Sequence, residues 1–349
     1  MILTYTENKI LPKELQDVLT KYYRRDPIGL IGCRSSQINY PVCEYDILAI
    51  TDNAESTLTM KIGPYFLEII GTDKGSLDNL RNARLALTLT QLQVINDPDW
   101  TLASSINKIK GERLRKFRVV FAREQISQSL AKLGRCNESL QDGNIYDASF
   151  WLLSSGYDCF EAVVGYGGNP PAASHLVSQL KRSSELLGEH IDWHSIMGFS
   201  EASTNSVARR LQCLTLLGES CKTIVKSFPS LKDVGRLKMF GSDEFIRLAR
   251  ARERFLLSSH NVVEAYSYLG LEAIRALEEI HLAKYIVKDK NPSYGSILKG
   301  LSSSQSSSFR VGGDPAKMLG LTGNIGIVES RVETLRSTIK KLTDWCSRE

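Results

Sequence analysis

The first hundred residues combine one apolar helical stripe with several short apolar runs. Apolar positions that recur every three or four residues predict a helix over residues 11–25, ended by Asp26-Pro27. A second stripe predicts a helix over residues 76–90. Apolar runs bounded by turn residues predict strands over 28–31, 46–50, 57–62, 65–70 and 92–95.

The pattern changes to a helical period after Ser104 and keeps it. Together with the preceding strands this predicts an α+β protein, in which a mixed-sheet domain is followed by a mainly α-helical bundle. Val328, Val332, Leu335, Ile339 and Leu342 form a short heptad seam, which favours a terminal helix docked on the core over a coiled-coil contact. The predicted parts are a domain over 1–105, a helical domain over 106–288, a flexible Gly/Ser-rich loop over 289–326, and a helix over 327–349 packed on the helical domain.

Composition narrows the class of protein only slightly. A net charge of +5 over 349 residues permits a polyanionic partner without requiring one. The seven cysteines are scattered and form no Cys-x-x-Cys pair, which argues against a zinc ribbon or a disulfide scaffold and for reduced cytoplasmic thiols. Neither a signal peptide nor an apolar run of membrane-spanning length is expected, so we predict a cytoplasmic protein without a membrane partner.

The segment from Gly32 to Leu48 carries the most specific chemistry. A small-residue turn, Gly32-Cys33-Arg34-Ser35, is followed after a short spacer by Cys43-Glu44-Tyr45-Asp46. Alternation along a strand places Glu44 and Asp46 on the same face, where two like charges repel each other unless a cation lies between them. Carboxylates beside a tight turn are what a magnesium–nucleotide site requires. The other interpretation is a surface strand whose acids are solvated.

This segment resembles the signature of the nucleotidyltransferase superfamily of the DNA polymerase beta type, in particular its small prokaryotic members. Their pattern is Gly-Ser-Arg-Ala, a spacer, and then Ser-Asp-Ile-Asp-Leu. Gly32, Arg34 and Asp46 match the pattern, whereas Cys33 and Glu44 replace a Ser and an Asp. Ser35 and Cys43 are two smaller departures, and the strand end Val94-Ile95-Asn96-Asp97-Pro98 resembles a second family feature.

The resemblance implies roles for the acids. Glu44 and Asp46 would hold Mg²⁺, or Mn²⁺, and a third acid on a neighbouring strand would complete the metal site and accept the proton of the attacking hydroxyl. We expect Glu68 to be that acid, because it interrupts an apolar run, with Asp73 in reserve. The other interpretation of Glu68 is an acid on an edge strand that faces water.

The resemblance also implies a nucleotide site, with ATP as the expected donor. Gly32 and Cys33 would cradle the leaving pyrophosphate. Arg34 would either reach a phosphate or pair with Glu44. The hydroxyl acceptor could be a protein, a small molecule or RNA, and homo-oligomerisation is left open. A dense basic stretch precedes the helical half, and it favours a solvated helix face over an electrostatic rim: Lys108, Lys110, Arg113, Arg115, Lys116 and Arg118.

The helical half resembles the HEPN class of helical domains from Arg123 to Lys181. HEPN domains often accompany small nucleotidyltransferases, and some are ribonucleases with an Arg followed a few residues later by a His. Arg254 and His260 have such a spacing. The expected function is transfer of a nucleoside monophosphate. The alternatives are a non-catalytic nucleotide-binding or antitoxin-type regulator, and an RNA-directed nucleotidyltransferase or HEPN-type ribonuclease.

Overall fold

The computed structural model describes residues 11–36, 39–51, 58–79, 82–110, 112–188, 191–231, 236–288, 292–303 and 313–348. The chain divides into two compact units, Met1–Arg115 and Lys116–Glu349, so the boundary falls later than the predicted 105/106. The first unit holds a mixed sheet and the second is helical, which confirms the α+β class. Within the described residues, no helix combines the length and the apolar character needed to cross a membrane.

The first unit is built on a five-stranded sheet of order β3-β4-β2-β1-β5. Strands β2 and β4 pair in parallel, and the other neighbours pair antiparallel. Because β3 forms a hairpin with β4, the chain enters β4 in the same direction as β2. The strands are β1 (Ile28–Ile31), β2 (Tyr45–Ile50), β3 (Leu58–Ile62), β4 (Tyr65–Thr72) and β5 (Gln93–Asn96).

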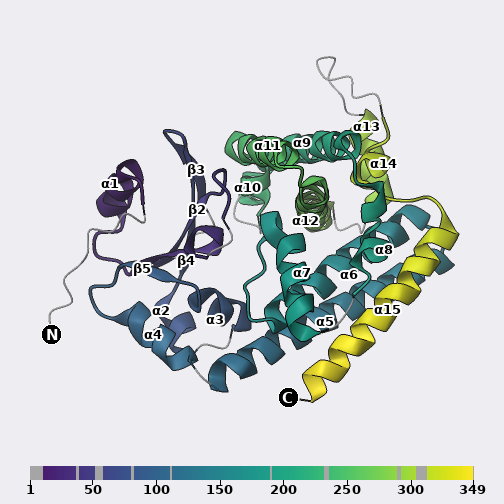
Figure 1. Ribbon diagram of the computed structural model, residues 1–349. Helices are drawn as coiled ribbons and strands as arrows, with labels where there is room; N and C mark the ends of the chain where they lie inside the picture. The colour runs from purple at the N-terminus through teal and green to yellow at the C-terminus, as the bar shows by residue number, and fades with distance from the viewer. Residues whose placement is uncertain are drawn as a thin grey trace. The chain divides into compact units, whose positions relative to one another are not determined.

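One hydrophobic cluster of this unit lies between α1 and the sheet. Helix α1 (Lys13–Tyr22) buries Leu15 and Leu19 against Ile47 of β2 and Leu67 of β4. Helices α2 (Lys74–Asn79), α3 (Ala83–Leu89) and α4 (Thr101–Ile109) lie together, away from α1 (Figure 1). Alternate residues of β2 and β4 therefore point away from the α1 core.

The helix predicted over 76–90 is broken in two. Asn82 accepts a hydrogen bond from the Leu85 backbone N–H at 3.0 Å and thereby caps α3. Asp73 accepts hydrogen bonds from the Ser76 backbone N–H at 2.8 Å and from its hydroxyl at 2.6 Å. Asp73 therefore begins α2 and Asn82 begins α3, although the apolar stripe alone predicts one continuous helix.

The second unit is a bundle of helices in which α12 packs most extensively on α9, and α6 on α7 and α15. Helix α6 is apolar on nearly all sides, as expected of a central helix. The helices are α5 (Glu112–Gln141), α6 (Ile145–Tyr166), α7 (Leu176–Leu187), α8 (Trp193–Met197), α9 (Thr204–Ser227), α10 (Leu237–Phe240), α11 (Asp243–Ser258), α12 (Val262–Lys288), α13 (Tyr294–Ser303), α14 (Pro315–Leu319) and α15 (Ile325–Ser347).

The predicted loop over 289–326 is wrong where the structure describes it. This stretch contains α13 and α14, and the large apolar side chains of these two helices are buried. Tyr294, Ile297, Leu298 and Leu301 follow a helical spacing that the many Ser and Gly residues obscured. Most of the serine run, residues 304–308, lies outside the described residues.

Helix α15 docks on its own unit, as expected for the final helix. The heptad residues Val328, Val332, Leu335, Ile339 and Leu342 are all buried. The helix packs on α6 and α8, and it is the long yellow helix in Figure 1. Its seam is therefore an intramolecular contact, which leaves no continuous apolar stripe for a coiled coil.

Candidate functional site

Three predicted acids meet on one face of the sheet. Asp46 of β2 and Glu68 of β4 are direct partners in the parallel ladder, so their side chains leave the sheet on the same side. Glu44 precedes β2 and alternates with Asp46. The three carboxylates offer ligand oxygens that all lie within 4.8 Å of one another. The fold thus brings together side chains 24 residues apart in sequence.

The acids are only partly exposed to water. Glu44 Oε2, Asp46 Oδ1 and Glu68 Oε1 are each buried. On the opposite face, Tyr45, Ile47 and Leu67 belong to the α1 core, so the predicted alternation of core and acidic faces holds along β2. Like charges this close raise one another's energy unless something neutralises them. As a donor set, three carboxylates suit a hard divalent cation.

Gly32 leaves the space that the Asp46 carboxylate occupies. Its φ is +70°, a left-handed conformation that glycine adopts most readily. A Cβ atom at this position would collide with Asp46 Oδ2 and lie 3.0 Å from Asp46 Cγ. Both the backbone angle and the close approach therefore require glycine beside this acid.

The turn that Gly32 opens is the short 3₁₀ helix η1 (Gly32–Ser35). The Ser35 hydroxyl donates to the Gly32 carbonyl at 2.9 Å, and the Ser36 hydroxyl donates to the Cys33 carbonyl at 2.9 Å. The Gln93 side-chain amide donates to the Ser35 carbonyl at 3.0 Å and ties the turn to β5. These bonds hold η1 at the end of β1, beside the acids.

Arg34 is bonded to its own loop rather than to Glu44. Its guanidinium donates to the Cys43 carbonyl at 2.8 and 3.1 Å and to the Pro41 carbonyl at 2.8 Å. It also lies over the Tyr45 ring, 4.3 Å from the centroid. Burial raises the pKa of Tyr45, an effect that the Arg34 charge partly offsets. Arg34 braces the segment entering β2, because its side chain folds back along its own loop.

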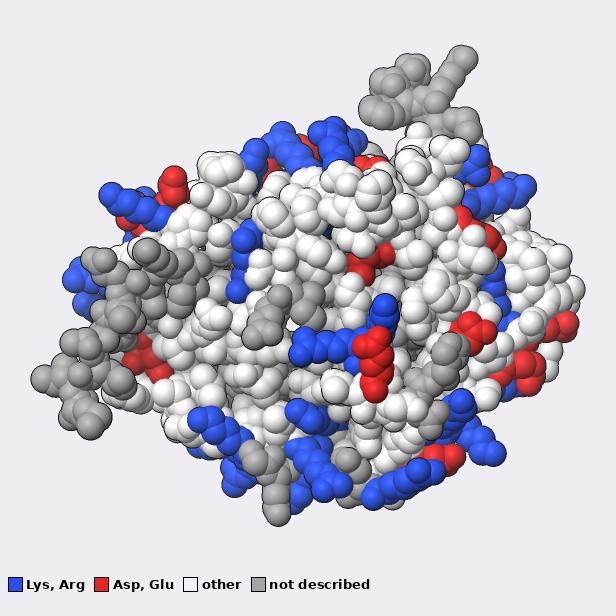
Figure 2. Space-filling view, viewed as in Figure 1, with Lys and Arg blue, Asp and Glu red and all other residues white. Residues whose placement is uncertain are grey.

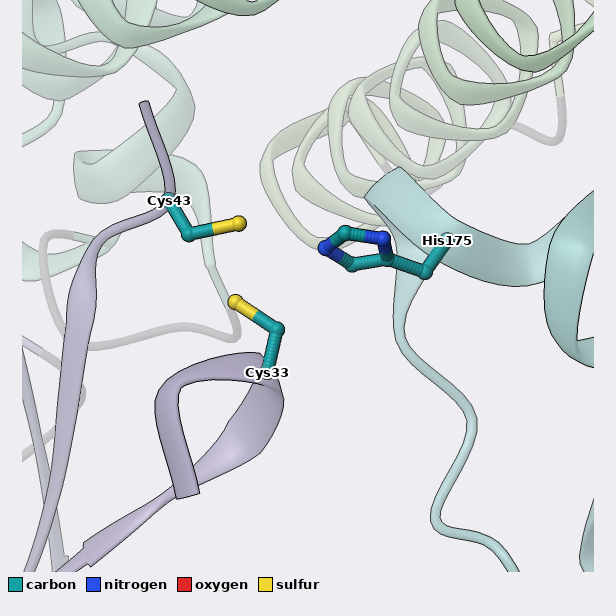
Figure 3. Close-up of side chains that lie close together, drawn as sticks. All are labelled: Cys33, Cys43 and His175. Atoms are coloured by element: carbon teal, nitrogen blue, oxygen red, sulfur yellow. The ribbon is translucent and has the colours of Figure 1, made fainter. Parts of the chain in front are cut away.

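Cys33 and Cys43 form a pair that sequence reasoning missed. Their Sγ atoms lie within 4.8 Å of each other, and the two sulfur atoms are neighbours in Figure 3. His175, also labelled there, belongs to η2 (Ala173–His175) of the second unit. No recognised motif spaces the two cysteines this way, so the only available signal was that both flank the predicted site.

Two further candidates in this region act as ordinary surface groups. Asp73, the reserve acid, caps α2, and its hydrogen bonds with Ser76 lower the pKa of Asp73. Asp97 likewise accepts from the backbone N–H groups of Leu102 and Ala103 at 3.1 and 2.9 Å, which is helix capping.

Lys and Arg side chains gather along the lower margin of Figure 2, where α4 and the start of α5 lie. Lys108, Lys110, Arg113, Arg115 and Lys116 are exposed, as expected of a solvated face.

The second unit contains partly buried ion pairs between its helices. Lys132 of α5 lies 2.9 Å from Asp158 of α6 and 3.4 Å from Glu278 of α12. Burial raises the pKa of Asp158 to about 6, although Lys132 lowers it. Burial disfavours the charged form of Lys132, but the two acids outweigh this effect and raise its pKa. The group ties three helices together.

Arg254 and His260 do not come together as a nuclease pair. Arg254 is on an exposed part of α11, and His260 is exposed in the turn that ends this helix, with a φ of +59°. The backbone N–H of the next residue, Asn261, donates to the Leu256 carbonyl at 2.8 Å. His260 therefore occupies the position that ends the helix. Among the described residues, no hydrogen bond or ion pair joins Arg254 to His260.

Comparison with known proteins gives limited information. No protein-family model matches the sequence, and no curated protein matches it. A solved structure, a nucleotidyltransferase-like protein from Exiguobacterium sibiricum 255-15, aligns over 85% of this chain and 96% of its own. The sequence identity is 11% and the TM-score is 0.32. Similarity this low establishes no shared activity, so function must be inferred from the residues of this chain.

Proposed function

We propose that the first unit is a metal-dependent nucleotidyltransferase domain, which moves a nucleoside monophosphate from a nucleoside triphosphate to a hydroxyl group. The observation that carries the proposal is the convergence of Glu44, Asp46 and Glu68 beside Gly32, with ligand oxygens within 4.8 Å of one another. ATP is the donor suggested by the family resemblance. The acceptor is a hydroxyl of a protein, a small molecule or RNA, all of which suit the same three carboxylates.

The carboxylates fit a resident Mg²⁺ or Mn²⁺ ion. Oxygen ligands of this kind are preferred by both ions, and three acids at this separation need a compensating positive charge. Glu44, Asp46 and Glu68 would hold the ion. When bound, it would neutralise charge on the triphosphate oxygens. Replacement of the family's Asp by Glu44 lengthens one ligand by a methylene, yet its carboxylate still reaches the other two.

The order of the strands supports different roles for the two sides of the site. The turn η1 follows β1, which pairs with one edge of β2, whereas Glu68 is on β4 at the other edge. In phosphoryl transfer the attacking and leaving oxygens lie roughly in line, on opposite sides of the phosphorus. We therefore assign the backbone of Gly32 and Cys33 to the leaving pyrophosphate.

Glu68 takes the proton of the acceptor hydroxyl in this proposal. The hydroxyl must lose its proton as it bonds to the α-phosphorus, and Glu68 is the acid on the side opposite η1. Arg34 is left out of the nucleotide site, because carbonyls of its own loop engage its guanidinium.

The test compares Asp46→Asn with wild type in calorimetric titrations with Mg²⁺ and a non-hydrolysable ATP analogue. Asparagine keeps the shape of Asp46 beside Gly32 but removes the charge, so binding should weaken by about tenfold or more. Asp73→Asn is the matched control, because this acid belongs to the same unit and lies outside the cluster; it should bind as wild type does. Absence of binding by the wild-type protein would overturn the proposal.

Turnover separates catalysis from regulation. Magnesium-dependent release of pyrophosphate from ATP, lost in Asp46→Asn, is expected of an enzyme. Tight binding of the analogue without pyrophosphate release, across protein, small-molecule and RNA hydroxyls, would instead favour the non-catalytic nucleotide-binding alternative.

A further inference from the structure

We propose that Cys33 and Cys43 form a reversible disulfide that switches off ligand binding at the carboxylate site. Cys33 directly follows Gly32, and Cys43 directly precedes Glu44. Their sulfur atoms lie within 4.8 Å of each other and are neighbours in Figure 3. The part of the proposal that concerns nucleotide binding rests on the proposed function, whereas disulfide formation does not.

The loop around Cys43 holds its sulfur in place. The Tyr40 backbone N–H donates a hydrogen bond to Cys43 Sγ at 3.2 Å. The Arg34 guanidinium donates to the carbonyl of the same residue at 2.8 Å, so both the side chain and the backbone of Cys43 are bonded within the loop. These bonds keep the Cys43 sulfur within 4.8 Å of the Cys33 sulfur.

All seven cysteines are buried, so burial by itself singles out none of them. Burial raises the pKa of Cys136 to about 11 and that of Cys213 and Cys221 to about 12, and neutral thiols in apolar surroundings react slowly with oxidants. The distinguishing property of Cys33 and Cys43 is their separation, because two sulfur atoms within 4.8 Å of each other need only a short movement to form a disulfide.

The reaction needs a small oxidant of the peroxide class, since Cys33 and Cys43 are only 6% and 3% exposed. One thiolate attacks a peroxide oxygen and breaks the O–O bond, which gives a sulfenic acid and, after proton uptake, one water molecule. The second thiol then attacks that sulfur, the S–O bond breaks, and a second water molecule leaves as the disulfide forms. A dithiol reductant reverses the reaction by thiol–disulfide exchange.

In this proposal, closing the bridge disturbs the acids. A disulfide fixes its sulfur atoms about 2.05 Å apart, so the bond ties η1 to the residue before Glu44 and draws the two segments together. Gly32 has no room to move toward β2, because it is already in close approach to the Asp46 carboxylate. Displacement on either side changes the positions of Gly32 or Glu44, and with them the arrangement of the three carboxylates.

Peptide mapping gives a direct test on the full-length chain. Cleavage after Arg34 by trypsin separates the two cysteines into peptides 26–34 and 35–61. After treatment with hydrogen peroxide, a non-reducing digest should contain these two peptides linked, and a dithiol should release them. Absence of the linked pair from oxidised wild type would overturn the proposal.

Ligand binding shows whether the disulfide acts as a switch. Oxidised wild type should bind Mg²⁺ with the ATP analogue about tenfold more weakly or worse than reduced wild type. Cys43→Ser should bind as reduced wild type does and should be insensitive to peroxide, and Cys346→Ser should respond as wild type does. A linked pair with unchanged binding would refute the switch. If the reduced protein does not bind the analogue, the proposed function is refuted. The linked peptides would then still show whether the disulfide forms.

Discussion

Gly32 and Asp46 occupy a space that admits no additional carbon atom. A Cβ atom on Gly32 would overlap the Asp46 carboxylate, and the φ of +70° also disfavours any other residue. Gly32→Ala should therefore lower the free energy of unfolding by about 3 kcal/mol or more and abolish binding of Mg²⁺ with an ATP analogue. Urea denaturation and calorimetry measure the two effects.

Gly63→Ala is the control for backbone strain alone. Gly63 has a φ of +56° in the turn between β3 and β4, but a Cβ atom there meets nothing within 4 Å. This variant should lose about 1 kcal/mol and bind normally. Equal losses in the two variants would contradict the close approach of Gly32 to Asp46.

Glu68→Gln should stabilise the metal-free protein and reduce the stabilisation that the metal provides. Without a divalent cation, removing one of three neighbouring negative charges should stabilise the protein by about 1 kcal/mol. In wild type, Mg²⁺ at a hundredfold excess over its Kd should add about 2.7 kcal/mol, and the variant should gain much less. Thermal unfolding with Mg²⁺ or a chelator tests this. The exposed Glu138→Gln should follow wild type, and a variant that gained as much as wild type from Mg²⁺ would argue against a metal at Glu68.

Asp158 should make stability fall as the pH rises. Its folded-state pKa of about 6 lies above the ordinary 3.8, so the folded protein binds this proton more tightly than the unfolded chain does. The contribution is present below pH 3.8 and is lost as the pH rises through about 6, with a total on the order of 3 kcal/mol.

Urea denaturation at several pH values measures this dependence. Asp158→Asn should flatten the curve between about pH 4 and pH 7, since an amide does not titrate there. The exposed Asp344→Asn should keep the slope of wild type. An unchanged slope in Asp158→Asn would mean that other groups dominate this pH range.

Leu298 tests the correction at residues 289–326. The side chain is buried in α13, so Leu298→Ala should cost about 2–4 kcal/mol of unfolding free energy. Its neighbour Lys299 is exposed, and Lys299→Ala should change stability by no more than about 0.5 kcal/mol. Denaturant unfolding measures both changes. If Leu298→Ala and Lys299→Ala had equally small effects, the flexible loop predicted from the composition would be supported instead.

At position 260, glycine should be more stable than alanine. It holds a φ of +59° at the end of α11, where glycine is usually preferred. His260→Gly should be more stable than His260→Ala by about 1 kcal/mol, because alanine keeps the Cβ atom that strains this conformation. Thermal unfolding measures the difference. RNA cleavage that is present in wild type and lost in both variants would revive the ribonuclease alternative.

The strands of the first unit could be predicted because their signals are local. The apolar run over 28–31 and the turn at Gly63-Pro64 have the same bounds or positions in the structure. The pairing of Asp46 with Glu68 could not be predicted by the same means, since parallel register depends on contacts distant in sequence. The direction of the Arg34 side chain and the proximity of Cys33 and Cys43 depend on how the loop between them folds back. Loop geometry of this kind produces no periodic pattern in the sequence.

The parallel register between β2 and β4 limits which changes of length this sheet can tolerate. Side chains alternate between the faces of a strand, so a shift of β4 by one residue would carry Glu68 into the α1 core and bring Leu67 or Ile69 to face Asp46. A single-residue insertion in the β3–β4 hairpin must therefore be absorbed in its turn at Gly63-Pro64. An insertion that shifted β4 would place an apolar side chain opposite Asp46 in place of Glu68. The site would then lose its third acid, although Gly32, Glu44 and Asp46 were all unchanged.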